Sequence, residues 1–187
     1  MRISRIYIDQ ELSPGSIAVA DSRTGHYLAK VLRLRAGDPL VVFNGDGSDY
    51  AAELYSAERD AMQLKINTRL PAAGESALHI TLVQAVSRGE RMDYSLQKST
   101  ELGVSAIQPV MTERVEVRLN EKRLARRMKH WHGVVASACE QSGRAVIPEL
   151  AEPVSLDTWL GQAEETLRLV LDPAADQSLS AQVPGAR

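Results

Sequence analysis

A polar helix end runs directly into an apolar strand at Gln97-Lys98-Ser99-Thr100-Glu101-Leu102-Gly103-Val104, which is followed by Ala106-Ile107-Gln108-Pro109-Val110. Gly103 is a typical helix stop, and the apolar run after it is typical of a buried strand. A helix that leads into a buried strand in this way is half of an α/β unit. Because polar side chains lie so close to a core strand, we expect a site at this point of the chain.

The alternation of strands and helices continues on both sides of this segment. Upstream, a strand is expected at Leu78–Val83 and a helix at about Glu90–Leu102, whose start Ser87 and Glu90 mark with the spacing of a capping box. Downstream, the patterns predict a helix at about Glu121–Gln141, a helix near Leu156–Ala163 and a strand at Leu167–Leu171. This order predicts an α/β domain with a mostly parallel sheet.

The first 70 residues have a different pattern. Asn44-Gly45-Asp46-Gly47 is a strong hairpin signal, because Gly and Asn tolerate the positive φ that tight turns need. A short helix is expected at His26–Leu34. Apolar or alternating runs predict strands at Ile3–Ile8, Leu40–Phe43, Tyr50–Tyr55 and Met62–Ile66. A compact β-barrel with one helix follows from these elements.

A linker separates the two patterns. Pro71-Ala72-Ala73-Gly74-Glu75-Ser76 has no apolar periodicity and combines Pro with Gly. We therefore expect a barrel domain at residues 1–70, a linker at 71–77 and an α/β domain at 78–187.

Composition excludes several classes of protein. The chain has 187 residues, 44% hydrophobic and 25% charged, which is typical of globular proteins. No apolar run approaches the ~18 residues of a membrane span, and the first residues alternate where a signal peptide would be apolar, so a cytoplasmic protein is expected. One cysteine and four scattered histidines predict neither a disulfide nor a metal site.

Charge is distributed unevenly behind a net charge of only -2. Residues 114–130 contain seven Lys or Arg against two acids. The N-terminal unit is also basic, with Arg2, Arg5, Arg23, Lys30, Arg33 and Arg35. A solvated helix face explains such runs in most proteins, but two basic segments also fit phosphate binding, which would depend strongly on salt. Aromatic residues make up only 4%, so a broad base-stacking sheet is not expected.

Two polar clusters are candidates for a pocket wall. Lys98 and Glu101 share a helix face with Gln97, and a cluster at the end of the long helix comprises Glu140, Gln141 and Arg144. Each also has an ordinary explanation, a solvated ion pair in the first case and a cation at a helix C-terminus in the second. Spacing alone leaves both interpretations open.

Taken together, several segments resemble a known family over nearly the whole chain. They are Arg2 to Tyr7, His26 through Arg33, Gln84 to Glu90, Gln97 to Val104, Pro109 with Thr112-Glu113-Arg114, and Glu140 to Arg144 with Pro148. In these segments the chain is similar to the bacterial 16S ribosomal RNA methyltransferases of the trefoil-knot (SPOUT) superfamily, which modify N3 of a uridine.

The resemblance implies a PUA-like RNA-binding barrel followed by a SPOUT α/β domain, a homodimer, S-adenosylmethionine as the methyl donor, and 16S ribosomal RNA of the small subunit as the substrate. An imide N–H is a poor nucleophile until its proton leaves, so such a site must favour the uridine anion. No catalytic base can be named. The expected RNA contacts are Arg2, Arg5, Arg33, Arg88 and Arg114, and the expected pocket wall is Gln97, Glu101, Glu140, Gln141 and Arg144.

The chain departs from the family after residue 172. There the family has a Gly-Pro-Glu-Gly-Gly loop that holds the cofactor, and residues 173–187 do not contain it. We therefore expect a C-terminally truncated, inactive form that keeps only weak cofactor contacts at Leu171 and Asp172. The alternatives are a non-catalytic RNA-binding or dimerisation module and an enzyme that uses Glu101 and Glu140 as an acid/base pair.

Overall fold

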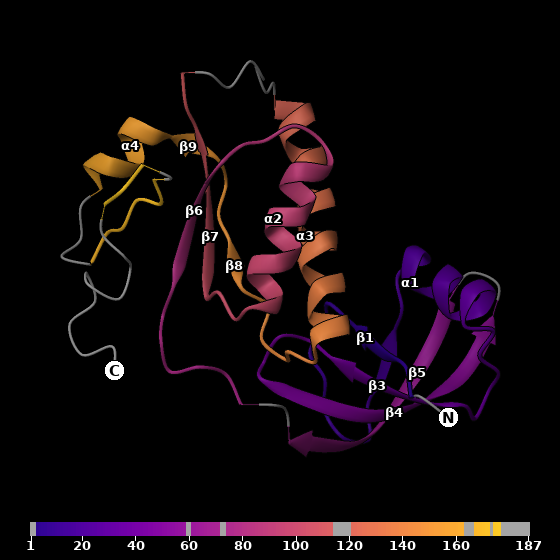
Figure 1. The fold of residues 1–187 in the computed structure, drawn as a ribbon. Coiled ribbons are helices and arrows are strands. Elements are labelled where there is room, and N and C mark those ends of the chain that lie inside the picture. The colour runs from indigo at the N-terminus through magenta and orange to yellow at the C-terminus, as the bar shows by residue number, and fades with distance from the viewer. Residues whose placement is uncertain are drawn as a thin grey trace.

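A computed structural model describes residues 3–58, 61–71, 74–113, 121–162, 167–172 and 174–176. It contains two sheets, each with its own hydrophobic core. In Figure 1 the first sheet lies at the carboxyl-terminal end of helix α3, and the second sheet is covered on one face by α2 and α3. The long helices thus stand between the two sheets.

The first sheet has five strands in the order β1-β3-β4-β5-β2. Its strands are β1 (Arg5–Tyr7), β2 (Ile17–Val19), β3 (Pro39–Phe43), β4 (Ser48–Glu58) and β5 (Ala61–Pro71). β1 pairs with β3 in parallel, and the remaining pairs are antiparallel. Two register shifts between β4 and β5 mark irregularities, which bend long strands and curl a sheet. The result is a curled, mixed sheet of the expected barrel type.

The predicted hairpin turn is confirmed. Phe43 pairs with Asp49 across it, and Gly45 and Gly47 have φ of 95° and 84°. The turn also touches the second half of the chain, because a Cβ at Gly45 would come 3.3 Å from Ile147 and Gly47 N donates to Ala145 O at 3.2 Å. Glycine therefore serves both the turn and the contact.

The helical segment of this unit begins earlier than expected. Helix α1 (Ser22–His26) continues into the π-helical turn η1 (Tyr27–Val31), whereas the sequence predicted a helix from His26 to Leu34. The reason is a cap: the Asp21 carboxylate accepts from Thr24 N at 2.7 Å. The segment ends at Arg33, which has a φ of 55° and is the only described non-glycine residue in the left-handed region.

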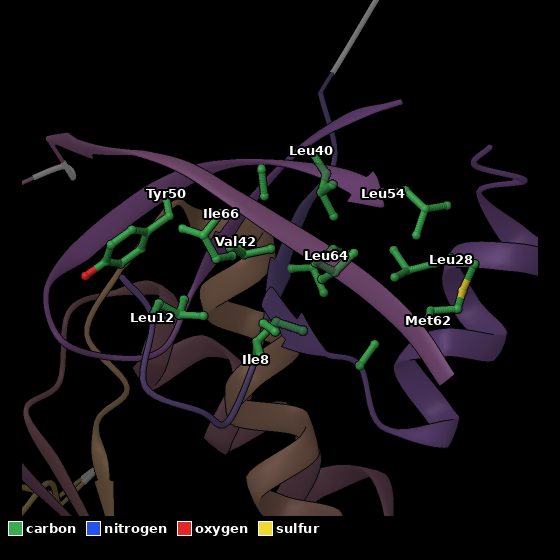
Figure 2. Close-up of a cluster of buried hydrophobic side chains, with 14 residues drawn as sticks. Ile8, Leu12, Leu28, Leu40, Val42, Tyr50, Leu54, Met62, Leu64 and Ile66 are labelled. Carbon is green, nitrogen blue, oxygen red and sulfur yellow. The ribbon is translucent and has the colours of Figure 1, made fainter. Parts of the chain in front are cut away.

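The core of the barrel lies between the curled sheet and this helical segment. Figure 2 shows Leu28 of η1 beside Met62 of β5, with Leu54, Leu64, Val42 and Ile66 in the same cluster. Leu28, Val42 and Leu54 are fully buried. Apolar burial on this scale stabilises the unit by about 25 cal/mol per Å² removed from water.

Every described strand pair of the second sheet is parallel, in line with the mostly parallel sheet that the sequence predicts. Its strands β6 (Thr81–Ala85), β7 (Ala106–Met111) and β8 (Glu149–Leu150) lie side by side, and β9 (Val154–Ser155) pairs with β7 farther along. The helices are α2 (Glu90–Glu101), α3 (Glu121–Ser142) and α4 (Leu156–Gly161). The apolar stripe of α3 is buried at Met128, Trp131, Val135 and Ala138.

Three local predictions in this half are wrong. The first strand begins at Thr81 rather than Leu78, and Leu78 is 64% exposed. Ser87 does not cap α2, because Gly89 occupies the N-cap position and the Ser87 hydroxyl donates to Ala85 O. Residues 167–171 form no strand; they have the apolar pattern of one, but no strand among the described residues pairs with them, and Val170 and Leu171 are 88% and 86% exposed.

Candidate nucleic-acid interface

A cavity of about 630 Å³ separates the barrel from helix α3. Its barrel wall comes from β1, the residues after it, and α1; its other wall is the carboxyl-terminal half of α3. The lining residues are Ile6, Tyr7, Ile8, Asp9, Gln10, Val19, Asp21, Ser22, Arg23, Thr24, Tyr27, Lys129, His132, Gly133, Ala136, Ser137, Glu140 and Gln141.

A second hollow of about 420 Å³ lies between α2 and α3 and shares residues with the first. Arg23, Gly133, Ser137 and Gln141 line both. Arg23 reaches from α1 across α3, and a Cβ built at Gly133 would meet its Nη1 at only 2.7 Å. The two hollows therefore form one groove along α3, and the Arg23 guanidinium crosses it where Gly133 leaves room.

Two exposed cations line this groove, Arg23 from α1 and Lys129 from α3, and further exposed cations follow on the same two sides although they line neither hollow. Lys122, Arg126 and Lys129 are exposed and share one face of α3, since they are spaced four and three residues apart, and Gly133 continues that face. On the barrel side, Arg23 lines the cavity, whereas Lys30 and Arg33 are exposed farther along the helical segment or just after it and line neither hollow. Lysines and arginines on two facing elements can bind phosphates on both sides of a groove.

Carboxylates also line the cavity, and of these Glu140 is half-buried whereas Asp9 and Asp21 are exposed. Glu140 accepts a hydrogen bond from the backbone N–H of Tyr7 at 2.9 Å through Oε1. Burial raises the pKa of Glu140 above its ordinary value, and the Tyr7 N–H together with Arg23 and Arg5 lowers it in part. The cavity therefore offers hydrogen-bond acceptors, which repel a phosphate and attract N–H donors.

Tyr7 adds a phenol to the wall of the cavity. Burial and the neighbouring Asp9 raise the pKa of Tyr7 to about 12, so that its hydroxyl stays protonated near neutral pH. That hydroxyl donates to Asp9 Oδ1 at 3.3 Å, and the ring packs at a tilt against Phe43 with centroids 5.5 Å apart. The ring is thereby held in place beside Glu140.

Arg5, an expected RNA contact, joins the two halves of the protein instead. Its guanidinium pairs with Asp49 at 2.7 Å and lies 3.8 Å from the Phe43 ring centroid. It also donates to Cys139 O at 2.7 Å and to Arg144 O at 2.8 Å. The side chain is only 13% exposed, so its donors serve the junction between β1 and the end of α3.

Arg144, expected in the pocket wall, lies outside both hollows and caps a helix. Its Nη1 donates to Thr100 O at 2.8 Å and Val104 O at 3.0 Å, where α2 ends, and its other nitrogens bind Glu75. The side chain is 9% exposed. The sequence interpretation as a helix-end cation was therefore right in kind, although the helix end that Arg144 caps belongs to α2 and not to its own helix.

The other candidates are divided between the groove and the rest of the surface. Gln97 lines the hollow between α2 and α3, and Gln141 lines both hollows. Glu101 pairs with Lys98 at 2.7 Å and lines neither, so it forms no acid/base pair with Glu140. Arg88 is exposed in the loop before α2.

Of the remaining expected contacts, two fall outside the described residues and two line neither hollow. Arg2 and Arg114 lie outside the described residues. Leu171 and Asp172 are exposed and line neither hollow. Neither hollow reaches the described carboxyl ends of the parallel strands, where open α/β sheets bind their ligands.

Of the residues that line the cavity, sequence reasoning selected only Glu140 and Gln141, and those that it missed include Arg23, Tyr27, Lys129 and His132. Arg23 and Lys129 were visible only as members of basic segments, and His132 as one of several scattered histidines. Their shared surface depends on packing α1 against α3, for which a single sequence carries no signal. The one local signal in this region is Asp21, a residue type that often caps helices, three positions before Thr24. It indicates where α1 begins but not which surface α1 shares with α3.

Among the described residues, no group of three or more His, Cys, Asp or Glu side chains is placed to hold a metal ion. Nor does the described part of the chain contain a helix with the length and apolar character to cross a bilayer.

Comparison with known families gives two matches. The model of a family described as an RNA methyltransferase domain matches residues 74–186, and that of an RNA methyltransferase PUA domain matches residues 20–67. These matches and the two sheets confirm the predicted fold class, a PUA-like barrel followed by an α/β methyltransferase domain.

Two relatives with sequence similarity share one name. A "Ribosomal RNA small subunit methyltransferase E" of Buchnera aphidicola subsp. Schizaphis graminum is 32% identical over 93% of this chain and 71% of its own length. That of Buchnera aphidicola subsp. Acyrthosiphon pisum is 30% identical over 84% of this chain. The chain spans 62% of the length of this second relative.

Solved structures agree with the sequence matches. A protein of Legionella pneumophila in complex with S-adenosylmethionine has a TM-score of 0.91 and 38% identity, over 97% of this chain and 75% of that one. A ribosomal RNA small subunit methyltransferase E of Neisseria gonorrhoeae bound to S-adenosylmethionine has a TM-score of 0.81 and 37% identity, over 88% and 67%.

Proposed function

This chain belongs to the ribosomal RNA small subunit methyltransferase E family, and we propose from that membership that it acts in the S-adenosylmethionine-dependent methylation of N3 of a uridine in 16S ribosomal RNA. RNA binding is supported by the groove along α3, which has exposed cations on both of its sides. The uridine and its N3 come from the family resemblance.

We assign different roles to the two halves of the chain. We assign residues 1–70 to RNA binding, 71–77 to a linker and 78–187 to the methyltransferase domain. Arg23, Lys30 and Arg33 on the barrel side and Lys122, Arg126 and Lys129 on the α3 side bind the RNA backbone. Arg88 is retained as a further RNA contact, as are Arg2 and Arg114 outside the described residues. Arg5 is not retained, because its guanidinium is engaged at the junction.

The described residues do not fit the cofactor as an enclosed site. Leu171 and Asp172, the expected contacts, are exposed, and neither hollow includes them. We therefore expect residues 1–187 on their own to bind S-adenosylmethionine weakly. For the same reason, no step of methyl transfer is assigned to a residue of this chain.

The same observation supports a second candidate, an RNA-binding or dimerising module without catalysis. Titration of S-adenosylmethionine into this chain, and into a form extended by the family's cofactor loop, separates the two. Binding by the extended form supports the enzyme. Binding by neither form leaves only the module.

Two further expectations belong to the proposal. A homodimer is tested by sedimentation, with exposed apolar side chains such as Leu102 and Val170 as candidate contacts. A cytoplasmic location is expected because ribosomal RNA is processed there, and fractionation of cells tests it.

RNA binding by the groove is tested through its salt dependence. Filter binding of a 16S ribosomal RNA transcript is measured over a range of salt concentrations, for the wild type and for Lys122→Ala/Arg126→Ala/Lys129→Ala. Each lost phosphate contact should lower the slope of log K against log salt by about 0.7 to 0.9. Lys65→Ala is the matched control, because Lys65 lies outside both hollows and pairs with Glu53 on the barrel surface. An unchanged slope in the triple variant would refute the groove as the RNA site.

A further inference from the structure

The cavity between the barrel and α3 has a volume suited to one nucleotide. Its volume of about 630 Å³ lies within the ~300–1,000 Å³ of pockets that hold small organic ligands. The rim and the interior differ in charge. Lys129 and Arg23 are exposed at the rim, whereas Glu140 is half-buried in the wall. An RNA backbone can lie on the rim while one base enters.

The cavity has carboxylate acceptors on two walls, one half-buried and one exposed. Glu140 comes from α3 and Asp9 from the residues after β1, so acceptors face the cavity from both sides. Glu140 Oε1 already accepts from Tyr7 N, and Oε2 has no hydrogen-bond partner among the described residues. A carboxylate has about four lone-pair positions, so both oxygens can still accept from a ligand.

A carboxylate binds guanine and uracil differently, because the two bases differ in the hydrogen-bond donors on their Watson–Crick edges. Guanine has two adjacent donors, N1–H and N2–H, on its Watson–Crick edge, which match the two oxygens of a carboxylate. Uracil has one donor between two carbonyls, and those carbonyls would face the Glu140 oxygens unfavourably. Burial raises the pKa of Glu140, because it disfavours the charged carboxylate. Two N–H donors from the base would offset this effect, since hydrogen bonds to the charged form favour it.

Two tyrosines offer a surface for stacking. Tyr7 is held against Phe43 beside Glu140, and Tyr27, which is 38% exposed, stands on η1 at the same cavity. Unpaired bases bind proteins by stacking on such rings while their edges are read by hydrogen bonds.

We infer that this cavity captures one unpaired guanine of the RNA substrate, a nucleotide distinct from the methylated uridine, with Glu140 accepting from its Watson–Crick edge. The inference rests on the proposed function, because it takes the substrate to be RNA. It adds a base-specific contact to the rim cations, which bind every sequence alike.

The test compares short single-stranded RNAs by fluorescence anisotropy at low salt. The probes are oligouridines of about ten nucleotides, either plain or with one central guanosine or one central inosine. The guanosine probe should bind the wild type about tenfold more tightly than the plain probe, the order expected for one bidentate contact. Inosine, which lacks the N2 amine, should fall between them.

Glu140→Gln should abolish the preference for guanosine and leave the affinity for plain oligouridine within about twofold. Glutamine retains an oxygen for Tyr7 N, and circular dichroism checks the fold. Glu101→Gln is the matched control, because Glu101 lies outside both hollows. The inosine probe gives a second measure that needs no variant.

The outcomes distinguish this inference from the proposed function. Equal affinity of the wild type for the plain and guanosine probes overturns the guanine site and leaves the rim as a general RNA site. A preference that persists in Glu140→Gln overturns the assignment of Glu140. Failure of the wild type to bind these probes and a 16S transcript overturns the proposed function as well.

Discussion

Removing the Arg5 guanidinium should weaken the protein at the junction between its two halves. In Arg5→Met the side chain keeps an unbranched apolar stem and loses the guanidinium with its charge. Asp49, 18% exposed, is then left without its 2.7 Å partner, and the carbonyls of Cys139 and Arg144 each lose a donor. The stacking of the guanidinium on Phe43 is lost too.

The magnitude follows from the burial of the pair. Removing one partner of a buried ion pair costs about 3 to 5 kcal/mol, because the remaining charge stays desolvated. The Arg5 and Asp49 side chains are 13% and 18% exposed. We therefore expect a loss of unfolding free energy at the lower end of this range, about 3 kcal/mol. With a urea slope of about 2 kcal/mol per molar, the unfolding midpoint should fall by about 1.5 M.

Urea unfolding is followed by the fluorescence of Trp131, which is buried in α3, and by circular dichroism. Arg5→Met/Asp49→Leu should recover part of the loss, because it removes the unpaired carboxylate. Lys65→Met is the matched control: it breaks an ion pair with Glu53 whose side chains are 47% and 35% exposed, and it should cost less than about 1 kcal/mol. A loss below about 1 kcal/mol in Arg5→Met would show that the junction does not depend on this arginine.

Four further predictions concern single side chains. Because burial raises the pKa of Glu140 in the folded protein above 4.5, its contribution to stability is present below that pH and is lost as pH rises through the folded pKa. Urea titrations should therefore show the wild type losing stability relative to Glu140→Gln as the pH rises from about 4.5 through the raised pKa of Glu140, and parallel curves would contradict this. Burial also raises the pKa of Cys139 to about 11, so a thiol reagent near pH 8 should label it only after unfolding; rapid labelling of the native protein would count against the buried position. Gly133→Ala should displace Arg23, whose Nη1 lies 2.7 Å from the new Cβ, and lower RNA affinity while thermal stability holds or rises, because alanine favours helix by about 1 kcal/mol; the double variant with Arg23→Ala should show no further loss of affinity. Arg33→Gly should relieve a φ of 55°, raise stability by about 1 kcal/mol, and weaken RNA binding, and an unchanged midpoint would mean that Arg33 is not strained.

Much of the local structure was predictable because it depends on neighbours in the chain. The long helix at 121–142 follows from its apolar stripe, and the turn at 44–47 from residues that tolerate positive φ. The errors arose where a local pattern has a tertiary condition. Residues 167–171 have a strand pattern, but a strand also needs a neighbour to pair with its backbone.

The site residues were also predictable only where their role depends on neighbours in the chain. Glu140 and Gln141 could be selected as polar residues at a helix end, and both line the cavity. Arg5 and Arg144 looked equally suited to a ligand. Their partners Asp49, Cys139, Thr100 and Glu75 are at least 40 residues away in the chain.

The sequence by itself determined the fold class, the family resemblance and the presence of two basic segments, since each is written in residue types and short spacings. Tertiary structure alone decided which arginines face solvent and which are used as internal connections. It also decided that Arg23 crosses α3 at Gly133. The physical reason is that a guanidinium binds a phosphate and a buried carbonyl by the same donors, and only packing determines which of them is within reach.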